Sequence, residues 1–375
     1  MDMSAITPSS MQLNKLKWET TTEYNTGLDA TFLKGKLRFT VDVYQKYVKD
    51  LLQPKVKMPT TIGYGNGYQI SYMNSGKMTN KGWEFRVDAV PFQNKDWRVG
   101  VYFNIAHNEN KITEMPDNYI EENYTFGNGN YAYRREEGRP MGSFYGYRYK
   151  GVYQNKDATY ARDIEGNVMK DISGNAIVMR NGSYTVAPGD AIYEDVNHDG
   201  VINQYDIVYL GNSNPRLTGG AGLNVSYKQF KLSAIFYGRY GQDVVNATRL
   251  NNESMRGIDN QSTAVLRRWR NEGDQTDIPR ALYGEGYNTL GSDRFVEDAS
   301  YLRLKSLSFT YRLPKKAIQR WGFNNIDVYV TGYNLFTWTN YTGQDPEVKT
   351  ENTYAKDTAT TPASIQLVAG FNLSF

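Results

Sequence analysis

Residues 95–108, KDWRVGVYFNIAHN, alternate between apolar and polar side chains with a period of two. Consecutive side chains of a β-strand point to opposite faces of the sheet, so this alternation predicts a strand with one apolar and one polar face. The C-terminal residues 365–375, IQLVAGFNLSF, repeat the pattern. The apolar face of the first stretch comprises Trp97, Val99, Val101, Phe103 and Ile105, and the other face comprises Arg98, Gly100, Tyr102, Asn104 and Ala106.

Nine segments of the chain carry this alternation. Several of them reach the ~9–11 residues with which a tilted strand crosses a bilayer. Their polar faces carry Gly, Ser, Asn and Lys, which suit a water-filled lumen better than a dry core. The predicted strands are residues 17–32, 36–49, 81–90, 95–108, 217–228, 230–240, 301–313, 326–338 and 365–375.

The connections between these strands alternate between short and long, as they do in outer-membrane barrels, where short turns lie inside and long loops outside. We therefore expect an all-β fold of about nine antiparallel strands that belongs to a transmembrane β-barrel with long external loops. Bacterial single-chain barrels have an even number of strands, so nine predict only part of a barrel. The short connections are residues 33–36, 91–95, 228–229 and 314–325, and the long ones are residues 50–79, 110–215, 243–299 and 339–362.

The composition excludes several other classes of protein. The chain of 375 residues has no cysteine, which excludes disulfide scaffolds, thiol catalysis and Cys-ligated metals. Its 43 Lys and Arg against 40 Asp and Glu argue against nucleic acid as a partner. No apolar run approaches the ~18 residues of a transmembrane helix. The first residues lack the basic and apolar regions of a signal peptide.

Nothing in the sequence predicts an enzyme. The two histidines, His107 and His198, are far apart and have no serine nucleophile motif near them. The adjacent carboxylates at residues 121–122 and 136–137 lie in polar loops, and chain adjacency is not what places two carboxylates across a glycosidic bond.

Residues 195–206, DVNHDGVINQYD, fit a twelve-residue calcium loop. Glycine at position six allows the sharp turn that gathers hard oxygen ligands. Asp replaces the usual Glu at position twelve, and an Asx-rich turn without metal is the alternative interpretation. The predicted Ca²⁺ ligands are the side chains of Asp195, Asn197, Asp199, Asn203 and Asp206 and the carbonyl of Val201. Upstream, DIEGN at residues 163–167 and DISGN at residues 171–175 predict two tight turns in an external subdomain.

Short motifs along nearly the whole chain resemble, in the same order, those of SusC/RagA-type TonB-linked outer membrane proteins. One difference is Tyr333, where this family commonly has a polar residue before NLF. The matching motifs are KWETT (17–21), KGWEF (81–85), GSFYGY (142–147), GNSNP (211–215), RW (268–269), DIPR (277–280), SYLRLK (300–305), YRLP (311–314), VYVTG (328–332), NLFTWT (334–339), YTG (341–343) and DPE (345–347).

This resemblance implies that residues 1–375 are the C-terminal part of a TonB-dependent receptor β-barrel in the cell outer membrane. It further implies import of oligosaccharides or peptides, a SusD-like surface lipoprotein as partner, and a TonB complex that acts on a plug. Large transporters of this kind close at about 22 strands. With neither plug nor TonB box in the sequence, we expect a fragment of such a receptor, embedded in membrane lipid. The terminal Phe375 resembles the C-terminal assembly signal of outer-membrane barrels.

Two alternatives remain at this point. The first is a soluble extracellular carbohydrate-binding or adhesive β protein with a calcium-braced loop. The second is a signalling variant of the receptor. The first differs from the barrel in what covers the apolar face of residues 97–105: lipid in a barrel, a sealed core in a soluble protein.

Overall fold

The computed structural model describes residues 16–57, 69–115, 129–132, 135–284, 286–351 and 354–375. Its main feature is a nine-stranded sheet in which every neighbouring pair is antiparallel and the strand order follows the chain without a crossover. The nine predicted strands are thereby confirmed. They are β1 (Thr20–Phe32), β2 (Leu37–Lys49), β5 (Lys77–Gln93), β6 (Trp97–Glu114), β13 (Leu217–Tyr227), β14 (Phe230–Tyr240), β17 (Tyr301–Arg312), β18 (Asn325–Thr339) and β21 (Gln366–Ser374).

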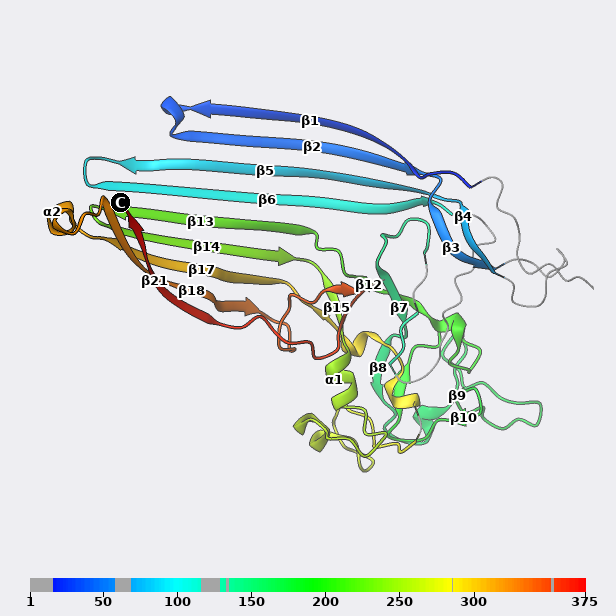
Figure 1. Cartoon of the computed structure of the whole chain (residues 1–375). Helices are drawn as coiled ribbons and strands as arrows, with labels where there is room; N and C mark the ends of the chain where they lie inside the picture. The colour runs from blue at the N-terminus through cyan, green and yellow to red at the C-terminus, as the bar shows by residue number, and fades with distance from the viewer. Residues whose placement is uncertain (1–15, 58–68, 116–128, 133–134, 285, 352–353) are drawn as a thin grey trace, which may run out of the picture.

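The sheet is a curved wall and is not closed, because β1 and β21 each have a sheet neighbour on one side only (Figure 1). The short connections lie together at one end of the wall, where the chain also reaches its C-terminus (Figure 1). This end carries the helix α2 (Lys315–Ile318) and the 3-10 turns Leu33–Gly35 and Gln319–Trp321. Strand β21 therefore runs toward the short turns, as the alternation of connections predicts.

The long connections gather at the opposite end of the wall into an external region (Figure 1). They contain short paired strands and single helical turns in place of plain loops. These elements are β3 (Leu52–Lys57), β4 (Gln69–Asn74), β7 (Ser143–Gly146), β8 (Tyr149–Val152), β9 (Arg180–Asn181), β10 (Tyr184–Thr185), β11 (Ala191–Tyr193), β12 (Val208–Asn212), β15 (Asp243–Asn246), α1 (Ala247–Asn252), β16 (Val296–Asp298), β19 (Thr350–Glu351) and β20 (Tyr354–Asp357), with 3-10 turns at Asp157–Thr159, Gln204–Asp206, Thr263–Arg267, Tyr287–Thr289 and Asp293–Phe295.

The hydrophobic core of the described residues sits in this external region and not in the wall. Its largest cluster is rich in tyrosine and draws on segments far apart in the chain. Two smaller clusters lie in the same long connections, one around Phe144, Val245 and Phe295 and the other around Val244, Ala299 and Tyr341. The largest cluster comprises Tyr147, Tyr153, Ala161, Met179, Val186, Ala191, Tyr193, Ile202, Tyr287 and Leu290.

The apolar face of the wall remains open. Phe103 is 42% exposed and Leu367 is 76% exposed, and many other large side chains of this face are exposed as well. A soluble sandwich would bury such a face against a second sheet, so its exposure favours the membrane-spanning interpretation. No described helix has the length and apolar character needed to cross a membrane.

Candidate functional site

The polar face of the wall is lined by ion pairs between neighbouring strands. Lys46 on β2 contacts Glu23 on β1 at 3.2 Å. Arg312 on β17 contacts Asp327 on β18 through two hydrogen bonds of 2.7 and 2.9 Å. Cross-strand pairs of opposite charge stabilise a sheet, and the register of the strands places both of these pairs on the same side as Arg98 and Tyr102 of β6. This side is therefore the hydrated lumenal surface.

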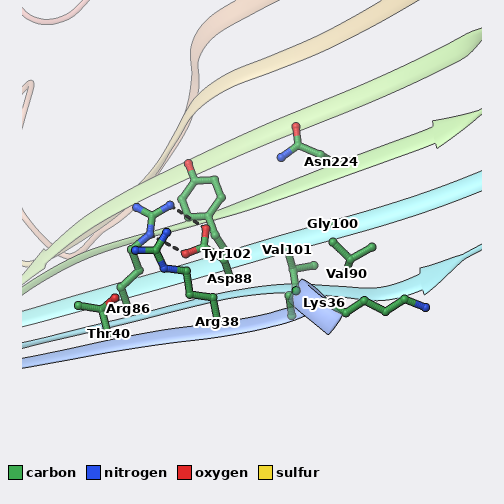
Figure 2. A pocket seen from close by; sticks show the side chains of 12 residues that line it. Lys36, Arg38, Thr40, Arg86, Asp88, Val90, Gly100, Val101, Tyr102 and Asn224 are labelled. Carbon is green, nitrogen blue, oxygen red and sulfur yellow. Dashed lines mark hydrogen bonds and ion pairs between the residues drawn. The ribbon is translucent and has the colours of Figure 1, made fainter. Parts of the chain in front are cut away.

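A hollow of about 530 Å³ lies on the polar face near the short turns (Figure 2). Arg86 donates from Nε and Nη2 to the carboxylate of Asp88 at 2.7 and 2.8 Å. The Arg86 guanidinium also lies 5.3 Å from the centroid of the Tyr102 ring. Lys36 and Arg38 line the hollow as well, and Arg38 contacts Asp29 at 3.6 Å, so three cations stand against the two carboxylates of Asp88 and Asp29. This excess of positive charge suits a partner that presents carboxylates or other anionic groups.

A buried charge cluster joins the wall to the external region. The side chain of Arg303 on β17 is 3% exposed and contacts Asp345 at 2.5 Å and Glu347 at 2.9 Å. It also donates to the hydroxyl of Thr337 on β18 at 2.8 Å. Lys305 shares Glu347 at 2.8 Å. The SYLRLK and DPE motifs, 42 residues apart at this contact, are therefore two halves of one network.

A second buried cluster holds the external region together. Asp190 is fully buried and accepts a hydrogen bond from Arg280 Nε at 2.7 Å. It also accepts from the hydroxyl of Tyr184 at 2.7 Å and from the amide of Ala187 at 2.8 Å. Burial, and next the hydrogen bond to Asp190, raise the pKa of Tyr184 above its ordinary value. Arg280 ends the DIPR motif, so this motif has a structural role in fastening residues 277–280 to the preceding loop.

The predicted calcium ligands lie within one loop. Asp195 accepts from the amide of Gly200 at 2.8 Å, and Asp199 accepts from the amide of Val201 at 2.8 Å. Position six is occupied by Gly200 with a φ of 79°, as the turn requires. Asn197 donates to Asp199 at 2.9 Å, so the side chains at positions three and five also meet.

Asp206, at position twelve, is fully buried and accepts from the amides of Val196 and Asn203 at 2.8 Å each. Burial raises the pKa of the Asp206 carboxyl, and the nearby carboxylates of Asp195 and Asp199 add to this rise. No described Lys or Arg forms an ion pair with these three carboxylates. An oxygen-rich set without a protein cation fits Ca²⁺ in its chemistry, although no group of three or more described His, Asp or Glu residues is close enough to hold a metal. Calcium binding stays a prediction.

The two histidines are not brought together. His107 Nδ1 lies 2.6 Å from the carbonyl oxygen of Arg216 at the outer end of β6, whereas His198 Nδ1 lies 3.3 Å from the carbonyl oxygen of Arg162 in the external region. The carboxylates at residues 121–122 lie outside the described residues. Glu137 accepts from the amide of Met115 at 2.8 Å, which is a structural contact.

An open antiparallel wall with an exposed apolar face and an ion-paired lumenal face defines the class of the protein as an outer-membrane β-barrel. The family model described as TonB dependent receptor-like, β-barrel matches residues 4–335. The chain belongs to this family.

Relatives support the SusC/RagA-type resemblance. The chain is 32% identical over 346 residues to TonB-dependent receptor P3 of Formosa agariphila, a match that covers 90% of this chain and 32% of that protein. It is 29% identical over 369 residues to TonB-dependent receptor SusC of Bacteroides thetaiotaomicron, covering 96% and 32%. The structure of the RagAB peptide importer in the closed-closed state matches with a TM-score of 0.71 and 28% identity, covering 98% of this chain and 37% of that one. The chain thus spans about a third of the length of these relatives, which are receptors and transporters and not enzymes.

Proposed function

We propose that this chain supplies nine strands of the wall of an outer-membrane TonB-dependent transporter that imports oligosaccharides or peptides. The observation that carries the proposal is the wall itself: its apolar face is exposed, and its opposite face carries ion pairs and the hollow that Arg86 and Tyr102 line. Such a wall encloses a hydrated passage only after further strands complete the barrel.

The two ends of the wall suit different partners. At the short-turn end, the excess of Lys36, Arg38 and Arg86 over Asp88 and Asp29 suits contact with an acidic surface of a plug, through which a TonB complex would act. At the other end, the external region has its own core and gives a rigid rim on which a SusD-like surface lipoprotein would close. Both partners are part of the proposal.

The proposal has two versions, which differ in whether the imported cargo is an oligosaccharide or a peptide. The solved relative RagAB is named a peptide importer, so peptides and oligosaccharides are both to be tested. Cells that carry the intact receptor, cells that lack it and cells that lack TonB are each given fluorescently labelled oligosaccharides and peptides. We expect uptake of one cargo class only when receptor and TonB are both present. Uptake of both classes that is unchanged in the deletion strain would refute the transporter proposal.

We further propose that residues 195–206 bind one Ca²⁺ ion that braces the external region. Asp195, Asn197, Asp199, Asn203 and Asp206 would supply side-chain oxygens, and Val201 would supply its carbonyl. Calorimetric titration with Ca²⁺ compares the wild type with Asp199→Ala and with Asp171→Ala, a control that removes an exposed turn carboxylate outside the loop. Heat of binding that is lost only in Asp199→Ala supports the site, and equal heat in all three proteins refutes it.

A further inference from the structure

The apolar face of the wall has a groove of about 550 Å³ at the external ends of five strands. A volume of this size lies within the ~300–1,000 Å³ range of small-molecule sites. One row of directly paired residues crosses the groove from β6 through β13, β14 and β17 to β18. The row reads Ile105, Gly219, Gly238, Leu302 and Trp338. The two glycines thus form the floor of the groove, and the large apolar side chains of Ile105, Leu302 and Trp338 stand on either side of it.

The backbone leaves no room for a side chain at either glycine of the floor. A Cβ atom on Gly219 would lie 2.6 Å from the carbonyl oxygen of Asn104, and one on Gly238 would lie 2.8 Å from that of Tyr301. The neighbouring row has the small Ala221 between Phe103 and Phe236, which extends the same depression. The groove is therefore fixed by the backbone.

The groove lies within the membrane. Trp97 and Tyr227, with ring centroids 4.3 Å apart, mark the inner interface next to the short turns. His107, the outermost residue of β6 that pairs with β13, follows Trp97 by ten positions. Ten steps correspond to about 34 Å along a strand and to about 26 Å along the membrane normal at a tilt of about 40°. This span matches an apolar band of about 25 Å. The groove, which begins at Phe103, is thus in the outer half of the bilayer.

The lining favours hydrocarbon over a protein partner. Phe103, Leu302 and Trp338 are 42%, 47% and 52% exposed, so a large apolar area is available. The one charged residue of the lining, Arg239, donates from Nε to the hydroxyl of Tyr237 on the lumenal face at 3.1 Å. The groove therefore presents apolar surface to the bilayer with no charged group to orient a protein.

We propose that this groove binds one hydrocarbon chain of a free lipid from the outer leaflet, so that the receptor carries a specifically bound lipid. The inference rests on the membrane-spanning wall and not on the identity of the cargo. The glycine floor lets the chain approach the backbone closely, and the side chains of Ile105 and Leu302 enclose it on either side. Tyr240 and Asn340 at the outer rim are placed beside the lipid headgroup.

The test uses the intact receptor reconstituted alone into phosphatidylcholine vesicles that contain a phosphatidylcholine with a photoreactive acyl chain. After irradiation, mass spectrometry locates the labelled peptides. Ala221→Phe fills the groove from β13, and Leu302→Trp narrows it from β17. The matched control is Val225→Phe, which adds bulk to the same face of β13 four residues away from Ala221.

In the wild type and in Val225→Phe, labelling of the groove peptides is expected to exceed labelling of the apolar face of β2 by about tenfold, which corresponds to about 1.4 kcal/mol of preference. Both groove variants should lose this excess. Even labelling over the whole apolar face, or an excess that survives in both variants, overturns the proposal. Loss of a receptor dimer in the groove variants, seen by native mass spectrometry without lipid labelling in the wild type, would identify a protein interface instead. Because no lipoprotein is present, a lipoprotein anchor cannot account for the labelling.

Discussion

Removal of the Asp190 carboxylate should loosen the external region without affecting the wall. Asp190 is fully buried and accepts from Tyr184, Ala187, Arg280 and Asn288. In Asp190→Ala these four donors lose their acceptor, and at about 1 kcal/mol for each hydrogen bond the loss is about 4 kcal/mol. Breaking a buried ion pair by removing one partner costs about 3–5 kcal/mol by an independent route. The two values agree.

Amide hydrogen exchange in the intact receptor measures this loss. The amides of Tyr153 and Arg280 donate to the carbonyls of Asp190 and Gly189, so they report opening of the region. A loss of about 4 kcal/mol accelerates their exchange by about a thousandfold, while amides of β13 exchange as before. Asp171→Ala, which removes an exposed carboxylate from the same region, is the control. The reasoning fails if Asp190→Ala accelerates exchange by less than about tenfold, or if β13 accelerates equally.

Two further predictions concern the wall and the turns. Arg303→Met removes the buried cation of Asp345 and leaves Glu347 with Lys305 alone, so it should destabilise the barrel by about 3–5 kcal/mol. Lys305→Met should cost less, because Lys305 is 33% exposed and contacts one carboxylate, which Arg303 still holds. The temperature at which each variant loses its folded band on semi-native gels measures the destabilisation. Equal decreases for the two variants would contradict the argument that the buried Arg303 contributes more than the more exposed Lys305. In the turn at Asp171, the hydrogen bond from the amide of Asn175 lowers the carboxyl pKa below its ordinary 3.8. The turn is thus stabilised above the unfolded pKa, and this contribution is lost as pH falls through the folded pKa. The Asn175 amide resonance should shift below pH 3.8 and not above it, and the shift should vanish in Asp171→Asn.

The wall could be predicted from the sequence because lipid on one side and water on the other impose alternation on every strand. Two predicted strands were too short at the end where lipid no longer imposes the alternation. Strand β5 begins at Lys77 and not at residue 81, and β6 continues to Glu114 beyond residue 108. At these outer ends the strands project beyond the apolar band, so the alternation no longer marks them. The turns at residues 163–167 and 171–175 were predicted correctly, since Asp163 and Asp171 each accept from the amide of the Asn four residues later.

The external core was not predicted. Strands such as β9 and β10 have two residues each and carry no periodicity that could reveal them. Tyr147, Tyr193 and Tyr287 come together only in three dimensions. For the same reason, the motifs that contain Arg303 and Glu347 could be recognised separately, but their ion pair requires the register of β17 and β18 and the course of the following loop.

The strand order that follows the chain has a consequence for how such a receptor can change over evolution. Each strand of the wall pairs with its neighbours in sequence, so no long connection has to thread through the sheet. Lengthening a connection costs little, because doubling a loop adds only about 0.6 kcal/mol of closure entropy. Insertions and deletions at the outer ends can therefore accumulate while the register of the wall stays fixed. The external region can thus differ between related receptors while the nine-stranded wall stays nearly the same.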